Sequence, residues 1–260
     1  MERLAKNIGG YRGETIGLPK ILRAIEEAAA GKNWVRDAVP LPSSNPAQPQ
    51  EFIAYRRPRD STRKRVYLSA GIHGDEPAGP VAALQLLQDD RWPADAAIWL
   101  CPCLNPTGLT LNRRENYQGI DLNRDYRHLQ SEEVRAHSEW LQQQPRFDIT
   151  LCLHEDWESN GFYVYEVNPD QRPSLAGKIT EAVAKVCPIE SAPLVDNWPT
   201  ENGVIRPKVN PAERPDWPEA LYLITNKSPL SYTMEAPSDF PLPTRVAALV
   251  AAVRAVLDLL

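Results

Sequence analysis

The stretch "LSAGIHGDEPAG", residues 68–79, decides the fold. It begins like the end of a buried strand and finishes like the start of a helix, with Pro77 where a first helical turn accepts proline. Glycines and one proline would be enough to build such a turn, because glycine supplies unusual backbone angles. His73, Asp75 and Glu76 are not needed for the turn itself, and they indicate a functional site.

Apolar runs and helical segments alternate on either side of this stretch. Strands are predicted over residues 65–72, 96–104, 147–154, 161–167 and 230–235, and helices over residues 77–90, 131–144, 174–186 and 244–260. The alternation predicts one α/β domain over residues 1–260, with a mixed, mainly parallel sheet and helices on both faces. Ligands of such sheets bind beyond the carboxyl ends of the strands. Four segments follow predicted strand ends: the opening stretch, "CLNPTG", "LHEDWESNG" and "TMEAPS".

The composition excludes several classes of protein. With 260 residues, of which 42% are hydrophobic, the chain can bury a large core, and its net charge of −5 argues against nucleic acid or membrane partners. No apolar run approaches the roughly 20 residues that span a bilayer. Residues 1–17 lack the apolar stretch of a secretion signal, so the expected location is the cytoplasm. Cys101 and Cys103 are expected to be ordinary buried thiols, and a metal role for this pair stays open.

A metal site is predicted from the histidines. His73 and Glu76 are three residues apart on a turn into a helix, which lets an imidazole and a carboxylate point at one centre. Catalytic zinc takes three protein ligands and keeps a fourth position for water, so a second histidine is needed. His154 closes an apolar strand and is the candidate. His128 and His137 lie in charged segments and are expected to be solvated.

Between these ligands lies "LNRRENYQGIDLNRDY", residues 111–126, with Arg113, Arg114, Asn123 and Arg124 and few apolar residues. Arginine presents a rigid fork that binds carboxylates through paired hydrogen bonds and stabilises a developing oxyanion. The segment is therefore either a charged surface loop or the substrate-binding side of the site.

The order of these motifs resembles the zinc carboxypeptidase family, most closely its small bacterial members, including the murein peptide amidases. HxxE is followed by RxNxxGxDLNR, by a histidine after an apolar strand and by a late glutamate. The resemblance spans about residues 65–237, and "GIDLNRDY" with the upstream "RREN" is its most specific part. It implies an α/β fold with a mixed eight-stranded sheet.

The resemblance implies a metal centre with one zinc ion. His73, Glu76 and His154 match the ligands, and Asp121 matches an acid that orients the first histidine. Mixed nitrogen and oxygen ligands favour zinc, and the same set also accepts nickel or cobalt.

The resemblance also implies one reaction. Glu235 in "LSYTMEAPSDFPLP", residues 230–243, matches the general base, and Arg114 matches the arginine that holds the oxyanion. Asn123 and Arg124 match the pair that binds the terminal carboxylate of the substrate. The expected enzyme is a zinc metallopeptidase that uses metal-activated water to cleave an amide bond beside a free carboxylate of a short or murein-type peptide.

Two other functions stay open. Aspartoacylases and succinylglutamate desuccinylases share the HxxE, DLNR and late histidine pattern and hydrolyse N-acyl amino acids, whereas "TMEAPS" and "HED" favour the peptidase. The second open function is that of a relative that only binds peptides. Such a protein would often lack a metal ligand or the general base, whereas this sequence has all the predicted metal ligands and the base. A serine hydrolase is disfavoured because the chain has no GxSxG motif. The sequence does not indicate an oligomeric state.

A proline-rich excursion precedes the strand of Glu235, over residues 187–223. Long ordered loops are often functional, so the excursion is either a wall or lid of the pocket or a plain surface loop. The resemblance also implies a mobile tyrosine near the leaving group. Tyr222 and Tyr232 are available, and neither has a context that assigns it this role.

Several acids surround the predicted ligands. Glu155, Asp156 and Glu158 are expected to be solvated charges at the rim of the site; otherwise they would select polar or amino-bearing substrates. Asp75 either competes with Glu76 for the metal or only shapes the turn.

Overall fold

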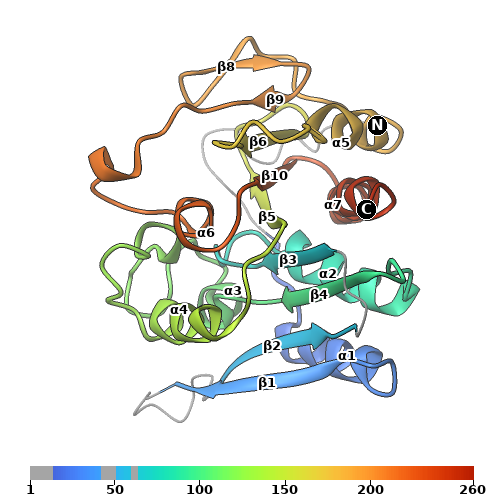
Figure 1. The fold of residues 1–260 in the computed structure, drawn as a ribbon, viewed down its shortest axis with the longest axis vertical. Helices are drawn as coiled ribbons and strands as arrows, with labels where there is room; N and C mark the ends of the chain where they lie inside the picture. Colours follow the sequence, from blue (N-terminus) through green and yellow to red (C-terminus); the bar gives the residue numbers. More distant parts are fainter. Residues whose placement is uncertain (1–13, 42–50, 60–63) are drawn as a thin grey trace.

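The apolar runs of the sequence form the centre of a single sheet in the computed structural model, which describes residues 14–41, 51–59 and 64–260. In this part of the chain the sheet has ten strands, in the order β1-β2-β4-β3-β5-β10-β6-β9-β8-β7 (Figure 1). The strands are β1 (Val35–Pro40), β2 (Glu51–Arg57), β3 (Lys64–Ala70), β4 (Ala96–Cys101), β5 (Ile149–Asp156), β6 (Tyr163–Val167), β7 (Leu194–Val195), β8 (Trp198–Glu201), β9 (Val204–Ile205) and β10 (Ser231–Pro237). The four central strands β4, β3, β5 and β10 are parallel, and antiparallel pairs dominate toward both edges.

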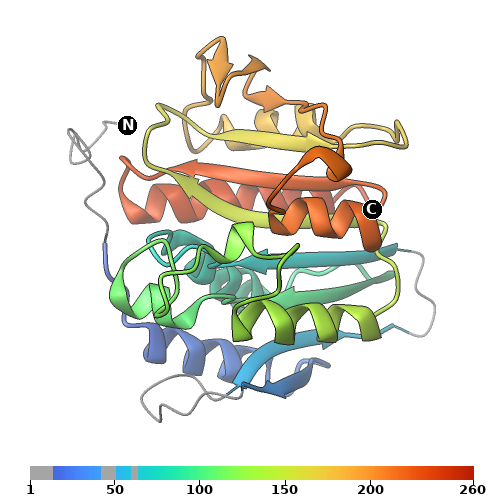
Figure 2. The ribbon, with the colours of Figure 1, turned by 90° about the vertical axis from the view of Figure 1, so that its left-hand side faces the viewer.

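Helices cover both faces of the sheet. One face carries α1, α2, α5 and α7, and the other carries α4 and α6, which Figure 2 shows in front of the strands. The helices are α1 (Leu18–Ala29), α2 (Ala78–Asp89), α3 (Pro106–Leu111), α4 (Glu132–Gln143), α5 (Ala176–Val183), α6 (Glu219–Asn226) and α7 (Leu242–Leu257), with short 3-10 turns η1 (Leu122–Arg124) and η2 (Pro211–Glu213). Each face has its own apolar core, and we call the core beneath α4 and α6 the second core.

The predicted fold class is confirmed, because the protein is a single α/β domain with a mixed sheet between helices. The expected number of eight strands is wrong, since ten are present in the described residues. The proline-rich excursion supplies three of the ten strands, β7, β8 and β9. Val204 and Ile205 are buried and pair with β6, so apolar side chains attach this segment to the edge of the sheet.

Two further expectations concern the chain as a whole. Residues 1–13 of the segment expected to lack a secretion signal lie outside the described residues. Among the helices that are described, none is both long and apolar enough to cross a bilayer. All four cysteines are buried and form no disulfide, in agreement with the expected thiols.

Candidate active site

The turn after β3 is held by close backbone packing. A Cβ atom on Gly74 would overlap the backbone of Gly108, so glycine is required there by the approach of α3. The Asn105 side chain donates to the carbonyls of Ile72 (3.1 Å) and Arg114 (3.2 Å). Asn105, which follows the second predicted strand, therefore links the turn of His73 to the arginine-rich segment through hydrogen bonds.

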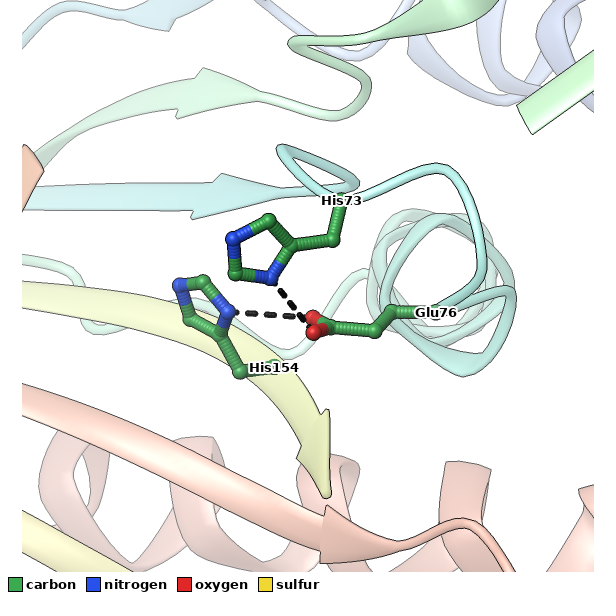
Figure 3. Close-up of side chains that lie close together, drawn as sticks. All are labelled: His73, Glu76 and His154. Atoms are coloured by element: carbon green, nitrogen blue, oxygen red, sulfur yellow. Dashed lines mark hydrogen bonds and ion pairs between the residues drawn. The ribbon is translucent and has the colours of Figure 1, made fainter. Parts of the chain in front are cut away.

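His73, Glu76 and His154 converge on one point at the carboxyl edge of the sheet (Figure 3). One potential ligand atom from each side chain lies within 4.8 Å of the others, and all three residues are buried. The Glu76 carboxylate lies between the imidazoles, with Oε1 2.5 Å from Nδ1 of His73 and Oε2 3.0 Å from Nδ1 of His154. Two nitrogens and one oxygen in a buried cluster fit the donor set of a catalytic zinc ion. Asp75 does not belong to this cluster.

The electrostatics of the cluster favour positive charge. Burial opposes protonation of His73, but the Glu76 charge and a hydrogen bond that His73 donates to Asp121 outweigh it and raise the pKa of His73 to about 9. Burial also opposes protonation of His154, but the charges of Glu76 and Glu235 outweigh it and raise the pKa of His154. The two imidazoles outweigh the burial of Glu76 and lower its pKa. A buried carboxylate needs such compensation, and a divalent cation between the same atoms would provide it.

Asp121 lies beside the first histidine, as the resemblance implies. Its Oδ1 is 3.4 Å from Nε2 of His73, the ring nitrogen that does not face Glu76, and its Oδ2 accepts a 2.8 Å hydrogen bond from Nε of Arg114. The backbone N–H of Asn123 also donates to Oδ1. One carboxylate thus connects a predicted metal ligand to two residues predicted to bind substrate.

A cavity of about 520 Å³ opens onto the cluster. Arg114, Asn123, Arg124 and Glu235 all line it, so the structure brings together every predicted residue except Asp121, which lies behind His73 and Arg114. Residues from the proline-rich excursion form part of the wall: Asp196, Trp198, Pro207, Val209, Arg214 and Pro218. The excursion is therefore more than a plain surface loop.

Glu235 lies on β10 in register with His154 of the parallel strand β5 and with Tyr163 of the antiparallel strand β6. Burial raises its pKa to about 8; Glu76 and Asp156 add to this shift, whereas His154 and Arg114 oppose it. A carboxyl group with a pKa close to neutrality can both accept and return a proton. The position and the pKa suit a general base.

Tyr163 and Tyr165 line the cavity beside Glu235 and were not singled out from the sequence. Their rings are 5.5 Å apart, and both project from one face of β6, as the alternation in "GFYVYEV" could have indicated. Tyr222 and Tyr232 do not line the cavity. Tyr222 packs in the second core, and the hydroxyl of Tyr232 donates to Glu166.

The expectation of solvated rim charges is wrong for Glu155. Its side chain is fully buried, forms an ion pair with the equally buried Arg245, and accepts a 2.5 Å hydrogen bond from the N–H of Ala78 at the start of α2. Successive side chains of a strand face opposite sides, so Glu155 points away from the side of His154. Glu155 nevertheless lines the cavity, as do Asp156, which is half-buried, and Glu158, which is exposed.

The expectation of a solvated side chain is also wrong for His137. Only 1% of this residue is exposed, and both ring nitrogens bond to tyrosine hydroxyls, those of Tyr67 and Tyr126. Burial lowers the pKa of His137 to about 3, so the ring is neutral. His128 is exposed as expected and lies 3.1 Å from Asp216.

The parallel centre of the sheet thus carries, at its carboxyl edge, three residues with the donor atoms of a metal site. The model of the family "Succinylglutamate desuccinylase/Aspartoacylase catalytic domain" matches residues 62–192, about half of the chain. The chain belongs to this family. No curated protein matches the sequence.

Solved structures share the fold. A Shewanella denitrificans OS217 protein, provisionally named a metallopeptidase, is 23% identical with a TM-score of 0.78, over 94% of this chain and 95% of its own. A metallo-carboxypeptidase from Burkholderia cenocepacia is 15% identical with a TM-score of 0.68, and the match covers 94% of this chain and 69% of its own. A metallo-carboxypeptidase from Pseudomonas aeruginosa, in complex with (2-guanidinoethylmercapto)succinic acid, is 19% identical with a TM-score of 0.67, and the match covers 94% of this chain and 69% of its own. The resemblance to zinc carboxypeptidases is thereby confirmed at the level of the fold.

Proposed function

We propose that this protein is a zinc-dependent hydrolase that cleaves an amide bond whose amine side carries a free carboxylate. The observation that carries the proposal is the convergence of His73, Glu76 and His154 within 4.8 Å, in a cavity that Glu235 and Arg124 also line. The buried carboxylate between two imidazoles, with Asp121 behind His73, supports a metal as the ligand of this cluster.

The residues of the cavity divide the reaction among them. Zinc in this cluster would supply Lewis-acid activation of water and of the scissile carbonyl. Glu235 accepts the proton of the attacking water and returns it to the leaving amine. Arg114 stabilises the charge that develops on the carbonyl oxygen, and Asn123 and Arg124 hold the carboxylate of the leaving group.

A short peptide, including one of the murein type, is the proposed substrate. The cavity of about 520 Å³ exceeds what a small acyl group needs, and Asp156, Glu158 and Asp196 line it. These acids would repel a second carboxylate on the acyl side, as in a succinyl group, and would accept an amino-bearing peptide.

Hydrolysis of N-acyl amino acids is the second candidate, and the family match favours it. Both candidates require a free carboxylate beside the amide, so they differ only in the acyl side of the substrate. The same active-site residues would serve either reaction.

A substrate panel with purified protein and measured zinc content tests the proposal. Short peptides and murein-type peptides are compared with N-acetyl and N-succinyl amino acids, each with its carboxylate free or amidated. We expect release of the carboxyl-terminal residue from the free peptides only. Preference for the acyl amino acids would support the deacylase instead, and zinc-loaded protein that binds peptides without cleaving them would indicate a binding protein.

Two variants serve as controls for the panel. Substitution of His73 by alanine should remove bound zinc and turnover together, because a ligand is lost. Full turnover of His73→Ala without metal would end the proposal. A surface variant, Lys178→Gln, should match the unmodified protein, because Lys178 is exposed on α5, pairs with the exposed Glu181 and does not line the cavity.

A further inference from the structure

A network of buried polar side chains lies in the second core, outside the proposed reaction. Its members are Tyr67 and Ser69 on β3, His137 on α4 and Glu219, the first residue of α6, and none is more than 1% exposed. A buried carboxylate among apolar side chains is costly unless its oxygens are hydrogen-bonded. The network therefore invites a functional explanation.

The donor and the acceptor of each hydrogen bond in this network follow from its neighbours. The hydroxyls of Tyr67 and Ser69 donate to the two Glu219 oxygens, over 2.7 and 2.9 Å. Because the Tyr67 proton is used in this way, its oxygen accepts from Nε2 of His137, 2.9 Å away. Nδ1 of His137 is then left as the acceptor of the Tyr126 hydroxyl, 2.6 Å away. The geometry assigns His137 the neutral tautomer with its proton on Nε2.

The network closes on the segment predicted to bind the substrate carboxylate. The backbone N–H of Glu219 donates to Oδ1 of Asn123, over 2.9 Å. Tyr126, three residues further on, is bonded both to His137 and, through its backbone N–H, to the carbonyl of Trp217. Residues 123–126 are thus held at both ends by one connected set of hydrogen bonds.

We propose that Glu219 is a positioning residue: by anchoring the start of α6 to β3, its carboxylate holds Asn123 and Arg124 where they meet the carboxylate of the substrate. This inference rests on the proposed function for the identity of the ligand. Glu219 does not touch the substrate itself, because its side chain faces the buried hydroxyls. Its effect should appear in carboxylate binding and only weakly in the chemical step.

The tautomer of His137 tests the network without any assay of activity. Methionine at position 219 keeps the shape and removes both acceptors, so the Tyr67 hydroxyl turns to Nε2 of His137, which lies 2.9 Å away. The proton of His137 then moves to Nδ1 and is donated to Tyr126. Glu219→Gln retains an acceptor oxygen and should restore the original tautomer.

Nitrogen-15 NMR of labelled histidine reads this change directly. The chain has four histidines, and the His137→Gln variant identifies the signal. We expect Nε2–H in the unmodified protein and in Glu219→Gln, and Nδ1–H in Glu219→Met. The side-chain amide signal of Asn123 should shift in Glu219→Met as well. An unchanged tautomer, or an Asn123 signal that does not move, overturns the proposal.

Steady-state kinetics with the substrate found in the panel test the consequence. In Glu219→Met we expect KM for the free carboxylate to rise about tenfold, the scale of one charge-assisted hydrogen bond, with kcat changed less than about twofold. Glu219→Gln should recover most of the loss. The zinc content should stay the same in all variants.

A matched control is Glu166→Met. Glu166 is also buried and accepts a 2.9 Å hydrogen bond from a tyrosine hydroxyl, that of Tyr232, but it belongs to neither the cavity nor the network. The Glu166→Met variant should leave KM and the His137 signal unchanged. A rise in KM equal to that of Glu219→Met would show a general loss of rigidity and overturn the proposal.

Tyr67→Phe provides a second break in the network should Glu219→Met not fold. If no substrate is turned over at all, the proposed function fails, while the two NMR signals still decide the positioning.

Discussion

The neutral His137 should make the stability of the fold depend on pH. Burial lowers its pKa from 6.5 to about 3, so between these values the unfolded chain binds a proton that the folded protein refuses. The contribution of His137 is therefore fully present above pH 6.5 and is lost as the pH falls from there toward 3. At pH 5, roughly 1.5 pH units below the pKa of this histidine in the unfolded chain, protonation of the unfolded state lowers the free energy of unfolding by about 2 kcal/mol, at about 1.36 kcal/mol per pH unit.

Urea unfolding at pH 8 and pH 5 measures this effect. Every other titrating group is shared with the variant His137→Gln, which offers a donor and an acceptor but has no proton to bind. Between pH 8 and pH 5, we expect the free energy of unfolding to fall by about 2 kcal/mol more in the unmodified protein than in the variant. Equal losses in both proteins would refute the assignment of a buried, neutral imidazole.

Three further predictions follow from individual contacts. Glu235→Gln should keep its zinc, measured by elemental analysis, and lose turnover by about 10²- to 10⁴-fold, because the proton acceptor is gone. Arg124→Ala should raise KM about tenfold for substrates with a free carboxylate and leave amidated ones unaffected, and a parallel rise for both would contradict carboxylate binding. Arg245→Met leaves the buried Glu155 without its cation, so chemical denaturation should show a loss of roughly 3–5 kcal/mol, whereas the double variant with Glu155→Gln should recover part of it.

The central strands could be predicted because their apolar runs are buried on both faces. β4 has six consecutive buried residues, and an uninterrupted run of this kind is visible in the sequence. β1 could not be predicted, since none of its residues is buried and its side chains include charges. It exists through pairing with β2, a contact between segments that local sequence does not reveal.

The candidate site could be predicted in part for a similar reason. His73 and Glu76 share one turn, and His154 and Glu235 end apolar strands, so the topology of a parallel sheet brings them together. Glu155 was placed wrongly because its partner Arg245 lies 90 residues away and is invisible to local charge patterns.

We expect the choice between peptide and N-acyl amino acid to depend on residues outside the family match. That match covers residues 62–192 and so contains the predicted metal ligands, Arg114 and Arg124, all of which both proposed reactions would use. Asp196 and Trp198, which line the cavity, lie beyond it, as does Glu235. The matched half therefore defines the chemistry that the two classes share, and the wall built by the proline-rich excursion is where their acyl specificity would diverge. Substitutions in that wall should change which acyl group is accepted while the requirement for a free carboxylate stays the same.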